Sequence, residues 1–250
     1  MTYCLAISVE QGLVLASDSR TNAGPDRIST FSKMHRFLGD GQRAFTLLSA
    51  GNLATSQAVV TQVRRDLEQS AERSLATVPH LSDAAEYIGM LNVAETRKHK
   101  REGDSDFKPE ATFVLGAEIA GRNPDIFLIY PEGNYIRASA HTPYLQAGEV
   151  KYGKPILDRI VRPDLSLEDA ARCALVSMDS TMRSNATVGP PIELAICEAR
   201  LMNGGRHLIL DEDDEYLRAL RQAWHAGLKS AFDRLPRLPA APPKMRLVDG

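Results

Sequence analysis

The chain has 250 residues with a formal net charge of −2, so it is long enough for a sizeable buried core and carries no basic footprint for nucleic acid. No segment has the pattern of a signal peptide, and no apolar run is long enough to cross a bilayer. The three cysteines lack metal-ligand spacing, so we expect free thiols, a reducing compartment and therefore the cytoplasm.

Alternating side chains predict two strands at the start of the chain, over residues 3–9 and 13–17, with a turn between them. Small or apolar residues occupy both faces, so we expect both faces to be covered. The second strand ends at Asp18, which places a carboxylate at the edge of the core. Residues 21–26 contain several turn formers and predict a loop.

Short extended pieces over residues 28–37, a hairpin signal at 39–41 and a strand over 43–49 follow. Apolar residues at helical spacing then predict a helix over 53–71 and a second helix that begins at an N-cap, Ser82. Two long helices after a block of strands form one layer of an α+β architecture.

The second half repeats this order. Strands are predicted over residues 111–119, 125–130 and 135–140, a short helix over 151–161, and strands over 192–199 and 206–210. A helix begins at Ser166, which opens a capping-box-like sequence. For residues 146–148 we predict no strand, only a segment that precedes the short helix. The alternating blocks predict two sheets between two helical layers.

The C-terminal region begins with an acidic run over residues 211–215. Acidic residues favour the first turn of a helix, where they meet exposed N–H groups, and this interpretation outweighs a metal site. An amphipathic helix follows to residue 235, and residues 236–250 form a proline-rich tail. This helix either packs on its own subunit or forms a contact between subunits.

The chemistry starts at the second residue. If Met1 is removed, Thr2 carries a hydroxyl nucleophile and an α-amine with a reference pKa of about 7.7–8.0, which suits a general base. Lys33 beside them would favour the alkoxide, and Asp18 would compensate that charge. Gly51 could offer its N–H to an oxyanion. Taken singly, each of these residues has an ordinary structural explanation.

Together these residues resemble the proteasome-type N-terminal-nucleophile peptidases, including the 20S β subunits and HslV, and in particular the bacterial branch called Anbu, the ancestral β subunit. The resemblance is carried by Thr2, by the A-S-D-S-R-T segment that contains Asp18 and Arg20, by S-K-M with Lys33 and by S-A-G with Gly51. It is dense over residues 1–54 and thinner, but collinear, through residue 199.

The resemblance implies a four-layer αββα sandwich over residues 1–210, a helical extension over 211–235 and the tail. It implies that Thr2 is nucleophile and base, that Asp18 and Lys33 tune it, that Arg20 supports the site and that the Gly51 N–H binds the oxyanion. A peptide substrate would add as a strand between Thr21 and residues 49–51. His35, Ser49 and Leu53 would line the pocket for the residue before the cut.

The chain departs from the family pattern at two supports of the proton relay. The middle loop of the family carries a serine beside a glycine, whereas this chain has Ala147 before Gly148. In the loop before the last core strands, Ser184 falls where the family has an aspartate, and Thr187 stands for the family's serine. These departures imply a slower enzyme rather than a different nucleophile.

The expected function is therefore a self-compartmentalising threonine peptidase that cleaves peptides or unfolded protein. The resemblance implies a ring or helical homo-oligomer of about a dozen subunits. No metal, cofactor, nucleic acid or membrane partner is expected, and nothing indicates whether an ATPase feeds the chamber. A non-catalytic ring subunit and an N-terminal-nucleophile amidase remain alternatives; the retention of Lys33 and Asp18 favours the peptidase, as does the lack of the N-terminal segment of α-type subunits.

Overall fold

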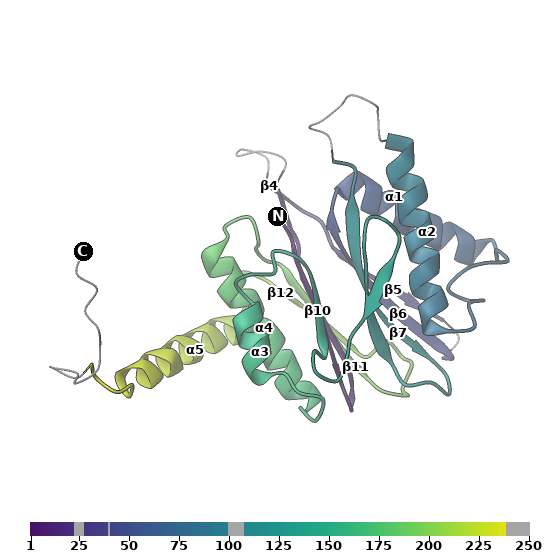
Figure 1. Cartoon of the computed structure of the whole chain (residues 1–250). Helices are drawn as coiled ribbons and strands as arrows, with labels where there is room; N and C mark the ends of the chain where they lie inside the picture. Colours follow the sequence, from purple (N-terminus) through teal and green to yellow (C-terminus); the bar gives the residue numbers. More distant parts are fainter. Residues whose placement is uncertain (23–27, 40, 100–107, 239–250) are drawn as a thin grey trace, which may run out of the picture.

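A computed structural model describes residues 1–22, 28–39, 41–99 and 108–238. Most of the loop expected over residues 21–26, the centre of the 39–41 turn and residues 239–250 of the expected tail lie outside this described part. Within it, two five-stranded antiparallel sheets face each other, and helices cover the outer face of each (Figure 1).

The start of the chain forms an inner strand of the first sheet. Its strands lie in the order β10-β1-β2-β11-β12, with every neighbouring pair antiparallel. Their bounds are β1 (Tyr3–Val9), β2 (Gly12–Asp18), β10 (Tyr144–Gly148), β11 (Ile192–Glu198) and β12 (Arg206–Leu210). The carboxyl end of β2 and the amino end of β1 therefore lie side by side.

The second sheet has the order β5-β6-β7-β8-β9. Its strands are β5 (Met34–Leu38), β6 (Arg43–Gly51), β7 (Ala111–Ile119), β8 (Asp125–Ile129) and β9 (Tyr135–Arg137). A two-stranded ribbon of β3 (Arg20–Asn22) and β4 (Ile28–Thr30) links the two sheets along the chain.

The helices form the outer layers (Figure 1). Helices α1 (Leu53–Glu68) and α2 (Leu81–His99) cover the second sheet, and α3 (Lys154–Ile160) and α4 (Leu167–Ser184) cover the first. Helix α5 (Glu215–Asp233) projects away from the sandwich. The expected αββα sandwich with an extra C-terminal helix is confirmed.

The first strand is buried on both faces, as its side chains predict. Leu5 and Ile7 belong to the cluster between the first sheet and its helices, whereas Cys4 and Ala6 belong to the cluster between the two sheets. All four side chains have no exposed surface. This burial anchors the strand that carries Thr2 at its amino end.

Local signals placed the starts of α4 and α5 correctly. The Ser166 hydroxyl accepts a hydrogen bond from the Asp169 N–H, as the capping-box pattern predicts. Asp214 caps α5 by accepting from the Leu217 N–H, so the acidic run begins a helix. No helix in the described part of the chain is both long and apolar enough to span a membrane.

Three expectations were wrong. Residues 144–148 form strand β10, which the sequence analysis did not predict; it is short, interrupted by Gln146, and exists because it pairs with β1. Ser82 lies inside the first turn of α2, where the His80 N–H bonds to the Asp83 carboxylate instead. Thr21, assigned to a loop, lies in β3.

Candidate active site

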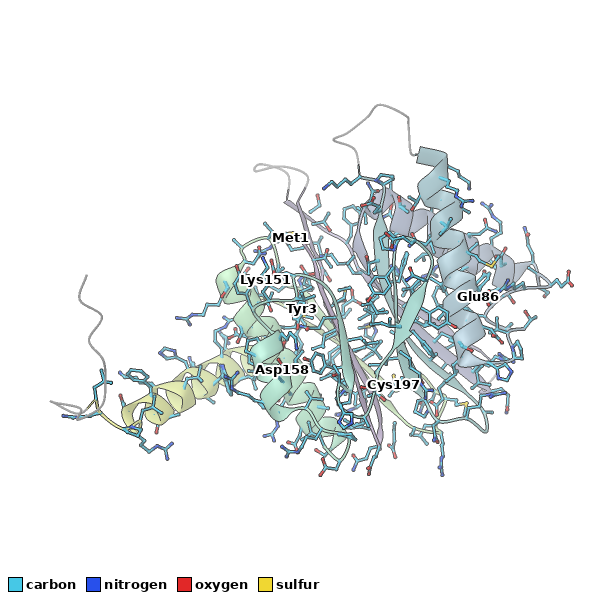
Figure 2. All side chains as sticks on the ribbon, viewed as in Figure 1. Met1, Tyr3, Glu86, Lys151, Asp158 and Cys197 are labelled. Atoms are coloured by element: carbon cyan, nitrogen blue, oxygen red, sulfur yellow. The ribbon has the colours of Figure 1, made fainter. Side chains whose placement is uncertain are left out.

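Thr2 is held at the open end of β1 by backbone contacts. Its carbonyl oxygen accepts a hydrogen bond of 2.7 Å from the Glu149 N–H. Gly148, with φ +85, passes so close that an added Cβ would lie 2.0 Å from that oxygen, so only glycine fits there. Met1 is 60 % exposed and lies at the same end of the molecule as Lys151, with Cys197 toward the other end (Figure 2).

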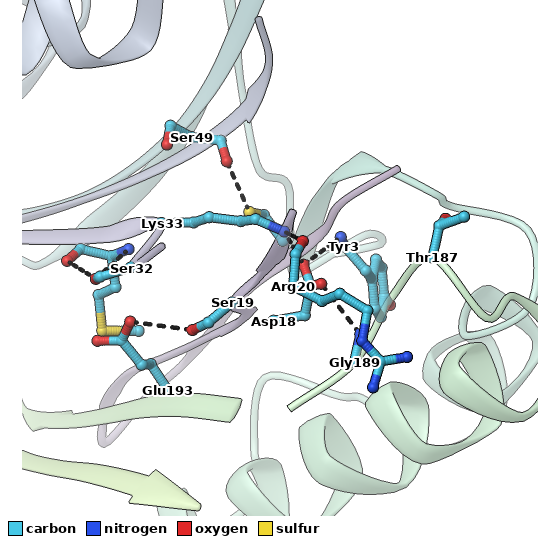
Figure 3. Close-up of polar contacts among 12 residues, drawn as sticks. Tyr3, Asp18, Ser19, Arg20, Ser32, Lys33, Ser49, Thr187, Gly189 and Glu193 are labelled. Atoms are coloured by element: carbon cyan, nitrogen blue, oxygen red, sulfur yellow. Dashed lines mark hydrogen bonds and ion pairs between the residues drawn. The ribbon is translucent and has the colours of Figure 1, made fainter. Parts of the chain in front are cut away.

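Beside Thr2 lies a buried ion pair (Figure 3). The Lys33 Nζ donates to the Asp18 Oδ1 at 2.7 Å and to the Arg20 carbonyl oxygen at 2.6 Å. Asp18 also accepts from the Tyr3 N–H at 3.0 Å and from the Gly189 N–H at 3.2 Å. Because Tyr3 directly follows Thr2, the carboxylate ties the nucleophile's strand to the lysine.

Burial and hydrogen bonding act in opposite directions on this site. Burial raises the pKa of the Asp18 carboxyl, whereas Lys33 and the Tyr3 and Gly189 N–H groups lower it. Three donors on one carboxylate favour its charged form. Cys4 lies in the same core, and burial raises the pKa of its thiol strongly, so it stays protonated and inert.

A cavity of about 350 Å³ opens beside Thr2. It is lined by Met1, Thr2, Thr21, Lys33, Ser49, Ala50, Gly51, Leu53, Ser56 and Gly148. Gly51 has φ +101, and a Cβ there would lie 2.5 Å from the Glu110 carbonyl oxygen, so the chain needs glycine at this wall. The Thr21 hydroxyl is buried and has no hydrogen-bond partner among the described residues.

The structure thus brings together Thr2, Asp18, Lys33 and Gly51, together with Thr21, Ser49 and Leu53. His35 behaves differently. It shares a face of the second sheet with Leu47, its partner on β6, but it is not among the described residues that line the cavity. Burial, with a smaller effect of Arg64, lowers the pKa of His35 to about 4, so the ring is neutral at pH 7.

The supporting residues lie on the far side of Asp18. The Arg20 guanidinium donates to the Ala186 carbonyl at 2.8 Å and packs on Gly189, where an added Cβ would lie 2.3 Å from Arg20 Cζ. Ser184 ends α4 and is exposed. The Thr187 hydroxyl donates to the Asn185 side chain at 2.6 Å and does not contact Thr2.

Two residues of this region were missed by the sequence analysis. Asn185 Nδ2 donates to the Glu149 Oε2 at 3.0 Å, so a side chain after α4 meets one directly after β10. Each of them directly follows a residue that the sequence analysis singled out, Ser184 and Gly148. The signal was available in part, because Asn185 opens a loop of turn formers and Glu149 directly follows the Ala147–Gly148 pair that the sequence analysis singled out.

Among the residues that the structure describes, no group of three or more histidine, cysteine, aspartate or glutamate side chains could hold a metal ion. The cavity contains a hydroxyl, a lysine and a backbone wall at Gly51, which are groups suited to attack on a carbonyl and stabilisation of the resulting charge.

Comparison with known proteins agrees with this geometry. The family model described as proteasome subunit matches residues 2–197. A proteasome subunit beta 2 from Pyrobaculum calidifontis is 23% identical over 203 residues, which are 81% of this chain and 90% of that relative.

Solved structures are more similar. Anbu (ancestral beta-subunit) from Yersinia bercovieri is 40% identical with a TM-score of 0.90, over 96% of this chain and 100% of that one. A subunit from the helical assembly of the Anbu complex from Pseudomonas aeruginosa is 41% identical with a TM-score of 0.89, over 95% and 98%. The chain therefore belongs to the proteasome subunit family, in its Anbu branch.

Proposed function

We propose that this chain is the subunit of a self-compartmentalising threonine peptidase in the cytoplasm, in which loss of Met1 exposes Thr2 as the nucleophile. One observation carries the proposal. The buried Lys33–Asp18 pair is joined through Asp18 to the Tyr3 N–H next to Thr2, and Lys33 lines the same cavity as Thr2 and Gly51. A lysine that is 3 % exposed needs a reason to be buried, and tuning a nucleophile supplies one.

The mechanism follows from the placement of these groups. The Thr2 α-amine takes the proton of the Thr2 hydroxyl, and Oγ attacks the carbonyl carbon of the scissile bond. The oxyanion that forms accepts a hydrogen bond from the Gly51 N–H. The amine then returns its proton to the leaving nitrogen, the C–N bond breaks, and an ester on Thr2 remains. Water, deprotonated by the same amine, hydrolyses that ester and restores Thr2.

The substrate we propose is an extended peptide. Its main chain would lie between Thr21 of β3 and residues 49–51 of β6, all of which line the cavity beside Thr2. Ser49, Leu53 and Ser56 line the part of the cavity beside the nucleophile. This lining favours a side chain of moderate size and mixed polarity before the cut. His35, placed in this pocket by resemblance, is not proposed as a contact.

We also propose that the protein assembles with copies of itself through α5. Leu217 is buried against the first sheet's helices. By contrast, Leu228 and Phe232 on the projecting helix are 51% and 72% exposed, and Leu235 just after it is 60% exposed. The Pseudomonas aeruginosa relative forms a helical assembly. Electron microscopy distinguishes an open spiral from a closed ring, and a purely monomeric protein would refute this part of the proposal.

Intact-mass spectrometry tests the catalytic part. The purified protein is expected to lack Met1 and to gain one adduct on Thr2 when treated with a peptide vinyl sulfone, a Michael acceptor for nucleophilic hydroxyls. Thr2→Ala should form none, and Thr142→Ala, which alters an exposed hydroxyl away from the described lining of the cavity, should still be modified at residue 2. Retained Met1, or adducts that persist in Thr2→Ala, would refute the assignment of Thr2 as the nucleophile. Adduct formation without cleavage of any peptide would favour the amidase alternative.

A further inference from the structure

A buried glutamate contacts Thr2 through its backbone and has no part in the mechanism above. Glu149 is 6 % exposed and follows Gly148, the residue that pairs with Tyr3. Its backbone N–H donates to the Thr2 carbonyl oxygen at 2.7 Å. The positive φ of Gly148 turns the chain sharply at this point, so the backbones of Glu149 and Thr2 are in direct contact.

The carboxylate of Glu149 is fixed by its surroundings. Oε2 accepts from Asn185 Nδ2 at 3.0 Å, and Oε1 lies 3.4 Å from the Lys151 backbone nitrogen. The amide of Asn185 is itself oriented, because its Oδ1 accepts from both the N–H and the hydroxyl of Thr187, at 3.0 and 2.6 Å. Two donors on Oδ1 require the NH₂ group to face Glu149.

This carboxylate lacks a cation. None of the ion pairs within the described residues includes Glu149, although it is buried. Burying a carboxylate without an opposite charge is costly. Removal of Met1 creates a positive charge in the neighbouring residue, the α-ammonium of Thr2.

We propose that Glu149 is a positioning residue that serves as the counter-ion of the Thr2 α-amine, with its carboxylate oriented by Asn185 and Thr187. The inference rests on the proposed function in that Thr2 must become the first residue. Glu149 is the charged residue that directly follows the turn at Gly148, and its backbone is in contact with Thr2. Asp18 approaches Thr2 from the end of β2 and Lys33 from the segment before β5, whereas Glu149 approaches from the end of β10.

The two charges act on the amine in opposite directions. Lys33 lowers the pKa of the amine, whereas an opposite charge at close range raises it by about one to three units. Asp18 is neutralised by Lys33, and the Arg20 guanidinium is turned toward the Ala186 carbonyl. The expected result is an amine that stays protonated near neutral pH, and an enzyme whose activity rises in alkaline solution.

The alternative is that Glu149 only anchors the loop that contains Asn185 and Thr187. In that case its charge is irrelevant, because glutamine offers the same acceptor to Asn185. Glu149→Gln therefore separates the two roles. The matched control is Glu118→Gln, since Glu118 is 4 % exposed and lies near the far end of β7, bonded to the Arg200 N–H.

Competitive labelling of the mature chain with acetic anhydride, read on the N-terminal peptide by mass spectrometry, measures the pKa of the α-amine directly. Glu149→Gln is expected to lower it by about one unit or more, and Glu118→Gln to leave it unchanged. Asn185→Ala, a second variant that frees the carboxylate, should move it in the same direction by less. An amine pKa that is equal in wild type and in both site variants would overturn the proposal.

The vinyl sulfone reaction separates this inference from the proposed function. A shifted amine pKa without any Thr2 adduct would refute the peptidase and leave the role of Glu149 standing. Adducts on Thr2 with an unchanged amine pKa would refute the role of Glu149 alone. Retention of Met1 would refute both, because no α-amine would then form on Thr2.

Discussion

The buried ion pair between Lys33 and Asp18 allows a quantitative test. The two side chains are 3 % and 0 % exposed, and the Lys33 Nζ is 2.7 Å from the carboxylate. Lys33→Met keeps most of the buried volume but leaves Asp18 with only the Tyr3 and Gly189 N–H groups. Removing one partner of such a pair costs about 3–5 kcal/mol of unfolding free energy, because an uncompensated charge stays buried.

The same variant should also slow the reaction of Thr2. Without the lysine charge the alkoxide is less favourable, and we expect the rate of vinyl sulfone modification to fall by about a hundredfold or more. Urea unfolding followed by circular dichroism measures the stability. Protein concentration must be constant across variants, since assembly adds to apparent stability.

A double-mutant cycle identifies the source of the loss. Asp18→Asn removes the charge from Asp18, so the combined variant should be more stable than the sum of single losses predicts, by about 2 kcal/mol. The control is Arg206→Met. The Arg206 guanidinium lies 2.9 Å from the Glu168 carboxylate, but the two side chains are 62 % and 65 % exposed. That change should cost about 0–1 kcal/mol. Additive losses in the cycle, or equal losses in Lys33→Met and Arg206→Met, would contradict the reasoning.

Three further changes have defined outcomes. Gly51→Ala should lower the unfolding free energy by more than about 2 kcal/mol and slow Thr2 modification, because the φ of Gly51 is +101 and the added methyl meets the Glu110 carbonyl. The control Gly41→Ala, at a residue with φ +80 and open space around it, should lose less stability. Equal losses in the two variants would argue against the clash. His35 has its pKa lowered from 6.5 to about 4, so stability should fall as pH drops through that window, by about 2 kcal/mol at pH 4.5. His35→Gln should lose that part of the acid sensitivity in urea unfolding at pH 7 and 4.5, and an unchanged pH dependence would exclude His35 as its source. Phe232→Asp, at a side chain 72 % exposed, should leave the unfolding of the protomer unchanged but reduce the assembled fraction in light scattering, and intact assembly would exclude this part of α5 from the contact.

Most of the fold followed from short-range patterns. Alternation over residues 3–9 predicted a strand covered on both faces, and the cores on its two sides confirm this. The Ser166 cap and the acidic start of α5 are interactions within one helical turn, which is why they could be predicted locally. Strand β10 was missed because its stability comes from pairing with β1, more than 130 residues away, and not from its own composition.

The residues of the candidate site also fall into two groups, those that the sequence indicates and those that only the tertiary structure brings together. Asp18 and Gly51 lie at or beside strand ends that short-range patterns predict, and the resemblance to the family picked out Thr2, Asp18, Lys33 and Gly51 from their order in the sequence. Which side chains support them was decided only by tertiary structure. Glu149 and Asn185 meet because a sharp turn at Gly148 and the end of α4 converge behind Thr2, and His35 faces Arg64 because of where α1 lies. Contacts of this kind depend on where distant elements pack, which no local pattern encodes.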